Sequence, residues 1–150
     1  MVFEKNGISR IEFGGMVMMY GHMQISAELN NDKVILTKSS GSDGSMDDVE
    51  EKIGSTEEFA ALINAISNLN IETKKDEDDE YALYACEKPE KSGAFEWHVI
   101  LYGSGEADIR LWLSGYNDRS SAFKTVSTAL SNACKDFGCI NDFFNLDRGE

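Results

Sequence analysis

Apolar and polar residues alternate along several short stretches of this chain, and a period of two predicts β-strands. The clearest stretch is residues 95–102, where the odd-numbered Phe95, Trp97, Val99 and Leu101 would share one face. Gly103-Ser104-Gly105 follows as a turn, and residues 107–113 alternate again. We therefore expect an antiparallel hairpin here.

The first part of the chain predicts further strands. Residues 23–29 and 33–38 alternate around Asn30-Asn31-Asp32, which is typical of a second hairpin. Residues 8–13 read as a strand that Gly14-Gly15 would interrupt as a turn or bulge. Residues 16–20 are apolar throughout, which predicts a strand covered on both faces. By composition, residues 39–51 read as a loop.

Two segments carry the apolar stripe of an amphipathic helix. Ser55 and Glu58 form a capping box before the stripe of Phe59, Leu62, Ile63, Ile66 and Leu69, and Asn70 would end that helix. Ser120 or Ser121 would cap the second helix, whose stripe is Phe123, Val126, Leu130, Ala133 and Phe137, with Gly138 closing it.

These elements predict a single α+β domain over residues 1–150. We expect an antiparallel sheet of about six strands with both helices packed on one face. The helix sequences also match position by position, with Phe59, Leu62 and Ile66 corresponding to Phe123, Val126 and Leu130. Residues 8–70 and 81–138 could therefore be half-repeats of one meander-and-helix unit, the alternative being chance similarity of apolar stripes.

With both helices on one face, the other face of the sheet has no predicted cover. Aromatic residues mixed with charges are more typical of an interface than of a plain solvated face. The residues expected there are Glu96, His98, Ile100, Tyr102, Asp108, Arg110 and Trp112, with Tyr84 nearby. Loops or the C-terminal segment could instead cover Trp112, and a second copy of the chain could pair with this face to give a homodimer.

Charge narrows the choice of partner. The chain holds 27 acidic and 14 basic residues, a formal charge of −13. Such a field repels nucleic acid and anionic membranes and attracts basic surfaces, although acidity can also serve solubility alone. The N-terminal segment lacks the apolar core of a signal peptide, and no apolar run is long enough to span a bilayer, so we expect a cytoplasmic protein.

No catalytic or cofactor motif stands out. Histidine occurs only at His22 and His98, Gly103-Ser104-Gly105 lacks the full G-x-S-x-G pattern, and no phosphate-binding glycine motif appears. Cys86, Cys134 and Cys139 have no zinc-type spacing, and the acidic runs lack the order of a calcium loop. We expect no catalytic residue, no metal and no cofactor.

The resulting hypothesis is a non-enzymatic acidic module that binds a basic protein and inhibits or neutralises it. In outline it resembles immunity proteins against nuclease toxins and phage proteins that mimic the charge of nucleic acid. The expected partner-binding residues are Asp47, Asp48, Glu50, Glu51, Asp76, Glu77, Asp78, Asp79, Glu80, Tyr84, His98, Tyr102, Arg110 and Trp112.

Two alternatives stay open. One is a small enzyme or ligand-binding domain with a pocket between sheet and helices, in which His98 would work with Glu96 or Asp108. The other is an accessory domain whose acidity has no charge-driven partner.

Overall fold

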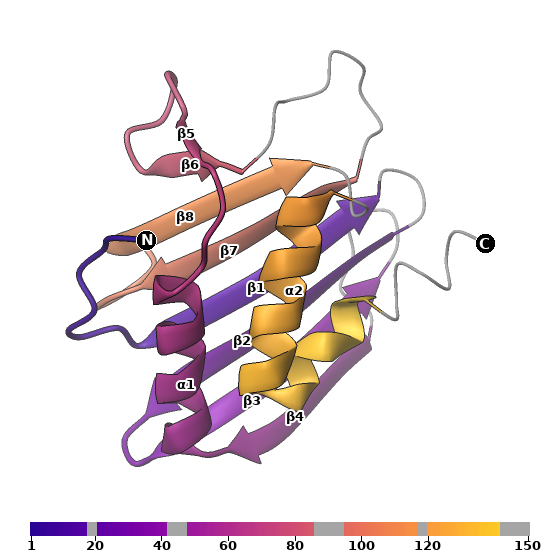
Figure 1. Cartoon of the computed structure of the whole chain (residues 1–150). Helices are drawn as coiled ribbons and strands as arrows, with labels where there is room; N and C mark the ends of the chain where they lie inside the picture. Colours follow the sequence, from indigo (N-terminus) through magenta and orange to yellow (C-terminus); the bar gives the residue numbers. More distant parts are fainter. Residues whose placement is uncertain (18–20, 42–47, 86–94, 117–119, 142–150) are drawn as a thin grey trace.

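A computed structural model describes residues 1–17, 21–41, 48–85, 95–116 and 120–141 of the chain. It consists of one eight-stranded sheet and a helical layer (Figure 1). The elements in chain order are β1 Arg10–Val17, β2 Gly21–Asn30, β3 Lys33–Gly41, β4 Asp48–Gly54, α1 Thr56–Ser67, β5 Lys74–Lys75, β6 Ala82–Tyr84, β7 Glu96–Tyr102, β8 Ile109–Tyr116, α2 Ser121–Ala133 and the 3₁₀ helix η1 Lys135–Gly138.

The strand order across the sheet is β4-β3-β2-β1-β7-β8-β6-β5. Strands β1 to β4 form an antiparallel meander, and β1 joins it to the β7–β8 hairpin. Strand β6 pairs parallel to β8, so the sheet is mixed and larger than the antiparallel sheet of about six strands that the sequence predicts. The extra strands are the charged edge strand β4 and the two-residue β5, neither of which shows an alternating apolar pattern.

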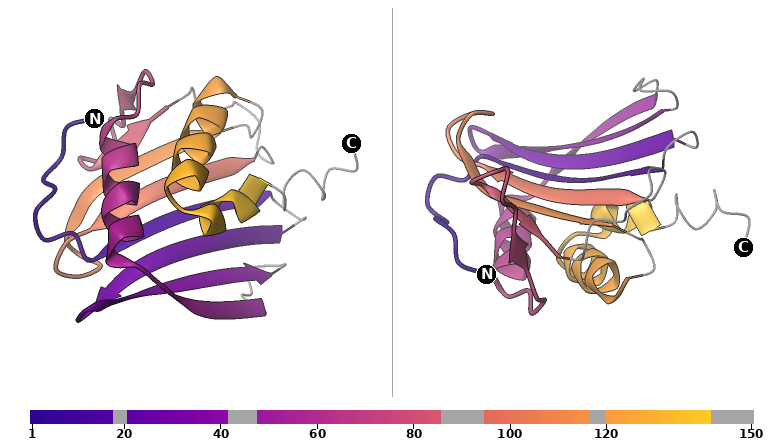
Figure 2. Two further views of the ribbon diagram at one scale, coloured as in Figure 1. Left: turned by 60° about the horizontal axis from the view of Figure 1, so that its bottom comes forward. Right: turned by 90° about the horizontal axis from the view of Figure 1, so that it is seen from above.

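Both helices and η1 lie on the same face of the sheet (Figure 2). A single core fills the space between the two layers. Its largest fully buried members are Trp97, Phe13, Phe95, Phe137, Ile11, Ile25, Leu62, Ile66, Leu101, Leu113 and Leu130. None of the helices in the described part of the chain is long and apolar enough to cross a membrane.

The predicted helix starts are confirmed. The Ser55 hydroxyl accepts a hydrogen bond from the Glu58 amide at 3.1 Å, and the Ser120 hydroxyl accepts one from the Phe123 amide at 3.1 Å. The predicted ends are wrong by a few residues. Helix α1 stops at Ser67, and α2 stops at Ala133, after which Cys134 is extended (φ −152°). The chain turns there, and Phe137 reaches the core from η1.

The glycine pair in the first strand does not interrupt it. Strand β1 runs through Gly14 and Gly15 to Val17, with every residue in register against β2 and, as far as Met16, against β7. The prediction that residues 16–20 are covered on both faces is wrong at Met16, which is 47% exposed on the face without helices. Residues 18–20 lie outside the described residues.

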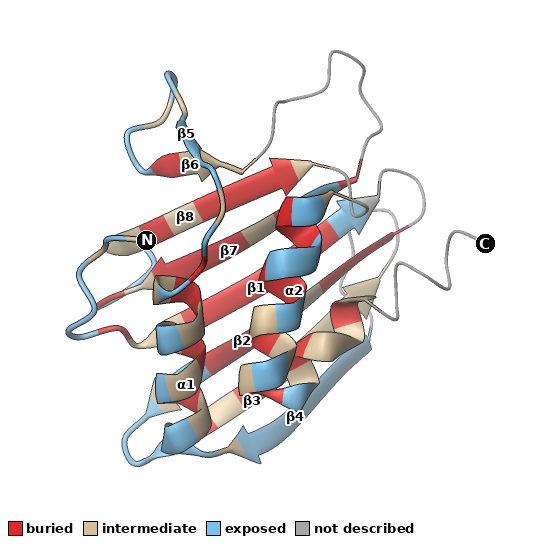
Figure 3. Cartoon of the chain, viewed as in Figure 1, coloured by how far each residue is buried: buried red, intermediate tan, exposed pale blue. Residues whose placement is uncertain are grey.

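The acidic stretch predicted as a loop contains a strand instead. Residues 48–54 form β4 at one edge of the sheet, and most of its residues are exposed (Figure 3). Charged side chains on an edge strand discourage pairing with another chain. Both halves of the chain place a hairpin before a helix, but the first half contributes a four-stranded meander and the second only β7–β8, with β6 added in parallel. The duplication itself stays a prediction.

Candidate functional site

No described element covers the second face of the sheet, which we call the open face (Figure 2). The pairing register places Glu12, Ile100 and Trp112 next to one another on the three central strands β1, β7 and β8. His98 and Tyr102 flank Ile100 on the same face. The sequence therefore predicted correctly which residues of β7 share a face with Trp112.

Glu12 is the centre of a polar cluster on the open face. Its carboxylate accepts hydrogen bonds from Arg10 Nη2 at 3.2 Å and from Gln24 Nε2 at 3.1 Å through one oxygen. The other oxygen lies 2.9 Å from His98 Nε2. These neighbours leave Glu12 only 8% exposed although no helix covers it. Burial of a carboxylate is costly unless such hydrogen bonds replace those lost to water.

The position of His98 depends on Gly14. A Cβ atom on Gly14 would lie 2.6 Å from His98 Cε1 and 2.8 Å from its Nε2, so the imidazole occupies the space of the absent side chain. A glycine within a strand often marks such a close approach. The ring can then lie across β1 and reach Glu12.

Tyr102 extends this cluster towards the other end of β1. The Arg10 guanidinium carbon lies 5.8 Å from the centre of the Tyr102 ring, within the range of a cation–π contact. Partial burial, followed by the nearby Glu12 carboxylate, raises the pKa of Tyr102 above its usual value. Tyr102 therefore remains neutral and offers a ring face and a hydroxyl group.

A second aromatic group lies beside Trp112, on β6 and β8. The rings of Tyr84 and Tyr116 stack with centroids 6.0 Å apart, and the Tyr84 hydroxyl donates to Asp76 Oδ2 at 2.9 Å. Burial, and then the bond to Asp76, raise the pKa of Tyr84. The Trp112 indole nitrogen has no hydrogen-bond acceptor among the described residues. Trp112 thus retains an unused donor within an aromatic patch.

Arg110 has a structural task that the sequence did not indicate. Its Nε donates to Asp108 Oδ1 at 2.9 Å, and its Nη1 donates to the carbonyl of Asn6 at 2.7 Å. Hydrogen bonds from Arg110 and from the Ser104 amide lower the pKa of Asp108. Arg110 therefore ties the N-terminal segment to the β7–β8 hairpin, and the same bonds engage Asp108, which we had considered as a partner of His98.

The two acidic runs do not form one patch. Strands β4 and β5 are the opposite edges of the sheet. Strand β4 lies five strand spacings from β8, or about 24 Å, so Asp48, Glu50 and Glu51 are remote from Trp112. Asp47 lies outside the described residues.

Within residues 76–80, two carboxylates are already engaged. Asp76 binds Tyr84, and Asp79 accepts a hydrogen bond from the Tyr81 amide at 3.0 Å. Glu77, Asp78 and Glu80 are exposed on the β5–β6 turn, close to the strand that neighbours Trp112. The acidic residues 76–80, rather than those of β4, therefore lie near the aromatic patch.

Carboxylates outnumber cations on the open face. Alternation along the strands places Glu12, Glu28, Glu51, Glu96 and Asp76 there, against Arg10, Lys33, Lys74 and Arg110. Arg10 is already bonded to Glu12 and Arg110 to Asp108, and Lys33 and Lys74 stand at the β2–β3 turn and on the outermost strand. The face therefore carries a small excess of carboxylates.

A pocket of about 370 Å³ opens on this face beside His98. Gly15, Met16, His22, Gln24, Glu96 and His98 line it. His22 is buried, and its Nε2 has no partner among the described residues. A sequence signal for this site existed, because both histidines and the glycine pair fall on adjoining strands, but reading Gly14-Gly15 as a break concealed it. Glu12, Gln24 and His22 were not predicted as site residues.

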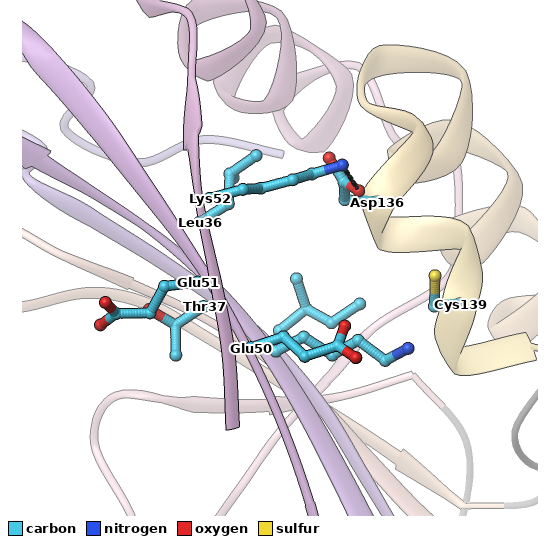
Figure 4. A pocket seen from close by; sticks show the side chains of 9 residues that line it. Leu36, Thr37, Glu50, Glu51, Lys52, Asp136 and Cys139 are labelled. Carbon is cyan, nitrogen blue, oxygen red and sulfur yellow. Dashed lines mark ion pairs between the residues drawn. The ribbon is translucent and has the colours of Figure 1, made fainter. Parts of the chain in front are cut away.

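A second pocket, of about 340 Å³, lies on the helical side between β3, β4 and η1 (Figure 4). Lys52 crosses it to form an ion pair with Asp136, which raises the pKa of Lys52. Glu50 and Glu51 both line this pocket, and in Figure 4 the Glu51 carboxylate points away from Glu50 and Lys52. Cys139 also faces this space.

The described cysteines and acids form no metal centre. Cys134 and Cys139 are free, Cys134 being buried and Cys139 partly exposed. Cys86 lies outside the described residues. In the described part of the chain, no three His, Cys, Asp or Glu side chains are grouped so that they could hold a metal ion.

Comparisons with family models, with curated proteins and with solved structures find no match to this chain.

Proposed function

We propose that this chain is a non-enzymatic binding module that docks a basic protein on its open face. The observation that carries the proposal is the combination of partly buried Trp112 and Tyr102 with a small excess of carboxylates over cations on that face. Tryptophan and tyrosine are enriched at the energetic centres of interfaces. The formal charge of −13 favours a positively charged partner.

The proposed mechanism has two stages. The exposed carboxylates Glu77, Asp78 and Glu80 attract the partner over a distance of about one Debye length, roughly 8 Å at physiological salt. Trp112 and Tyr102, both partly exposed, then anchor it through apolar contact of their rings. A basic nuclease, toxin or nucleic-acid-binding enzyme would be inhibited if its phosphate-binding surface were covered in this way.

Charge-matched variants test the proposal. Glu28→Lys with Glu51→Lys reverses two exposed carboxylates of the open face. Glu57→Lys with Glu72→Lys makes the same change in net charge at exposed positions of α1 and of the segment after it. Proteins captured from a lysate by the wild-type chain are eluted along a salt gradient and identified.

The proposal predicts a basic protein that the open-face variant captures at least about tenfold more weakly. The control variant should capture it nearly as well as the wild type. Equal losses in both variants would mean that only net charge matters, and the docking face would then be wrong.

A small-ligand function has one observation in its favour, the pocket on the helical side with its Lys52–Asp136 ion pair. A polar ligand of modest size would fit about 340 Å³, near the lower end of ordinary ligand sites. A thermal-shift screen with metabolites, repeated on Lys52→Met, tests this alternative. A shift that disappears in the variant would support it.

A further inference from the structure

The pocket beside His98 brings together both histidines of the chain. His22 enters from β2 and His98 from β7, on either side of β1. The pocket volume of about 370 Å³ lies within the range of small-ligand sites. Its walls belong to three neighbouring strands of the sheet, near the end of β1 and the starts of β2 and β7.

One polar atom in this site lacks a partner. His22 is only 9% exposed, and its Nε2 makes no hydrogen bond to any described residue. Buried polar groups in folded proteins are nearly always paired, so this unpaired but buried ring nitrogen of a pocket-lining residue can serve a ligand once the imidazole turns towards the pocket. His98, in contrast, already contacts Glu12 through its Nε2.

The charge around the pocket selects the type of ligand. Glu96 is exposed at the pocket and takes part in no ion pair with the described residues. The Glu12 carboxylate lies behind His98, and none of the described residues that line the pocket is a lysine or arginine. An anion would be repelled, whereas a cation would meet the Glu96 carboxylate. Met16, 47% exposed, provides an apolar wall for an alkyl chain.

We infer that this pocket receives an arginine or lysine side chain of the docked protein. The alkyl stem packs along Met16, and the cationic group lies between the Glu96 carboxylate and His22 Nε2, which accepts a hydrogen bond when the ring proton is on Nδ1. This inference rests on the proposed function, because it names the anchor that a basic partner would insert into the open face. Arginine is one of the three residue types most enriched at the hot spots of interfaces.

Small cations test the pocket without any knowledge of the partner. The intact protein is titrated with methylguanidinium or n-butylammonium at constant ionic strength while the imidazole ¹⁵N and ¹³C resonances are recorded by NMR. With only two histidines in the chain, a His22→Gln variant assigns the signals. N-methylurea, a neutral analogue of methylguanidinium, is the control ligand. Comparing the two cations distinguishes an arginine site from a lysine site.

The inference predicts saturable shifts of the His22 resonances with at least one cation and none with N-methylurea. Glu96→Gln should weaken this binding about tenfold, whereas Glu57→Gln, on the exposed side of α1, should leave it unchanged. Shifts that match those of added sodium chloride, or that persist in Glu96→Gln, would overturn the inference.

The two experiments distinguish a failure of the pocket inference from a failure of the proposed docking face. If the protein captures a basic partner through the open face but binds neither cation, the inference that the pocket receives a basic side chain is wrong and the proposed function still holds. In the opposite case, a cation binds and Glu96→Gln weakens this binding, but the variant with Glu28→Lys and Glu51→Lys captures proteins as well as the wild type. This result supports a cation site in the pocket and contradicts docking on the open face.

Discussion

The imidazole of His98 occupies the space in which a side chain on Gly14 would lie. An added Cβ would be 2.6 Å from His98 Cε1, closer than carbon atoms that are not bonded to each other can pack. This close approach allows His98 to reach across β1 and contact Glu12 at 2.9 Å. The glycine of one strand and the histidine of its neighbour therefore form a single structural feature.

Gly14→Ala should displace His98 and weaken its contact with Glu12. The expected loss in the free energy of unfolding is about 1–3 kcal/mol, the usual effect of an overpacked position. Urea unfolding measures it. Gly105→Ala is the matched control, since a Cβ there would meet nothing within 4 Å. Equal stability of the two variants would contradict the role assigned to Gly14.

The contact between Glu12 and His98 should appear as an energetic coupling. Glu12→Gln leaves Arg10 and His98 without their carboxylate and should destabilise the fold by about 1–3 kcal/mol. In a double-mutant cycle with His98→Gln, the coupling energy should reach about 0.5–3 kcal/mol. Glu28→Gln, exposed on the same face, should couple to His98→Gln by less than the error of the measurement.

Local patterns in the sequence predicted much of this fold. The two faces of β7 follow from the alternation of apolar residues such as Trp97 with polar residues such as His98, because successive side chains of a strand point to opposite faces. The two helix starts follow from the capping residues Ser55 and Ser120. The exposure of Met16 was not predicted, because an uninterrupted apolar run does not reveal whether both faces of a strand are covered.

The candidate site was harder to predict, because it depends on pairing between distant residues. Glu12 and His98 meet only because β1 pairs with β7, and no local pattern identifies that pairing. The sequence also did not predict strand β4. Its residues are mostly exposed and charged, as is common for a strand at the edge of a sheet, so they do not alternate between apolar and polar. Gly14-Gly15 was the most informative signal, and it was read as a break.

Cys134 should react with thiol reagents far more slowly than Cys139. Cys134 is 2% exposed, and burial raises the pKa of its thiol to about 11, so the reactive thiolate is scarce at pH 8. In a Cys86→Ser background, labelling with DTNB should first modify Cys139 alone. Cys134 should react only after unfolding. Equal labelling rates would contradict its burial beneath α2 and η1.

The raised pKa of the Cys134 thiol also predicts that the stability of the protein depends on pH. The usual pKa of a cysteine thiol is 9.0, so the unfolded chain loses this proton before the folded chain does. The free energy of unfolding of the wild type should therefore fall, relative to Cys134→Ala, as the pH rises from about 9 to about 11. Parallel stability profiles of the two proteins would show that the thiol does not titrate differently on folding.

Neutralising the free carboxylates of the β5–β6 turn should slow association with the basic partner. The variant Glu77→Gln, Asp78→Asn, Glu80→Gln leaves Asp76 bonded to Tyr84. At low salt its association rate should fall several-fold, and the rate should depend less on ionic strength, while dissociation changes little. Stopped-flow mixing with the captured partner measures both rates. An unchanged association rate would exclude electrostatic steering by this turn.

The docking face is the central claim, and site-specific photo-cross-linking in cells tests it most directly. A benzoylphenylalanine residue is placed at Met16, exposed on the open face, or at Glu57, exposed on α1. The account predicts covalent adducts with one basic protein from position 16 and none with that protein from position 57. Adducts from position 57 alone, adducts with a second copy of this chain, or an acidic partner at position 16 would contradict it.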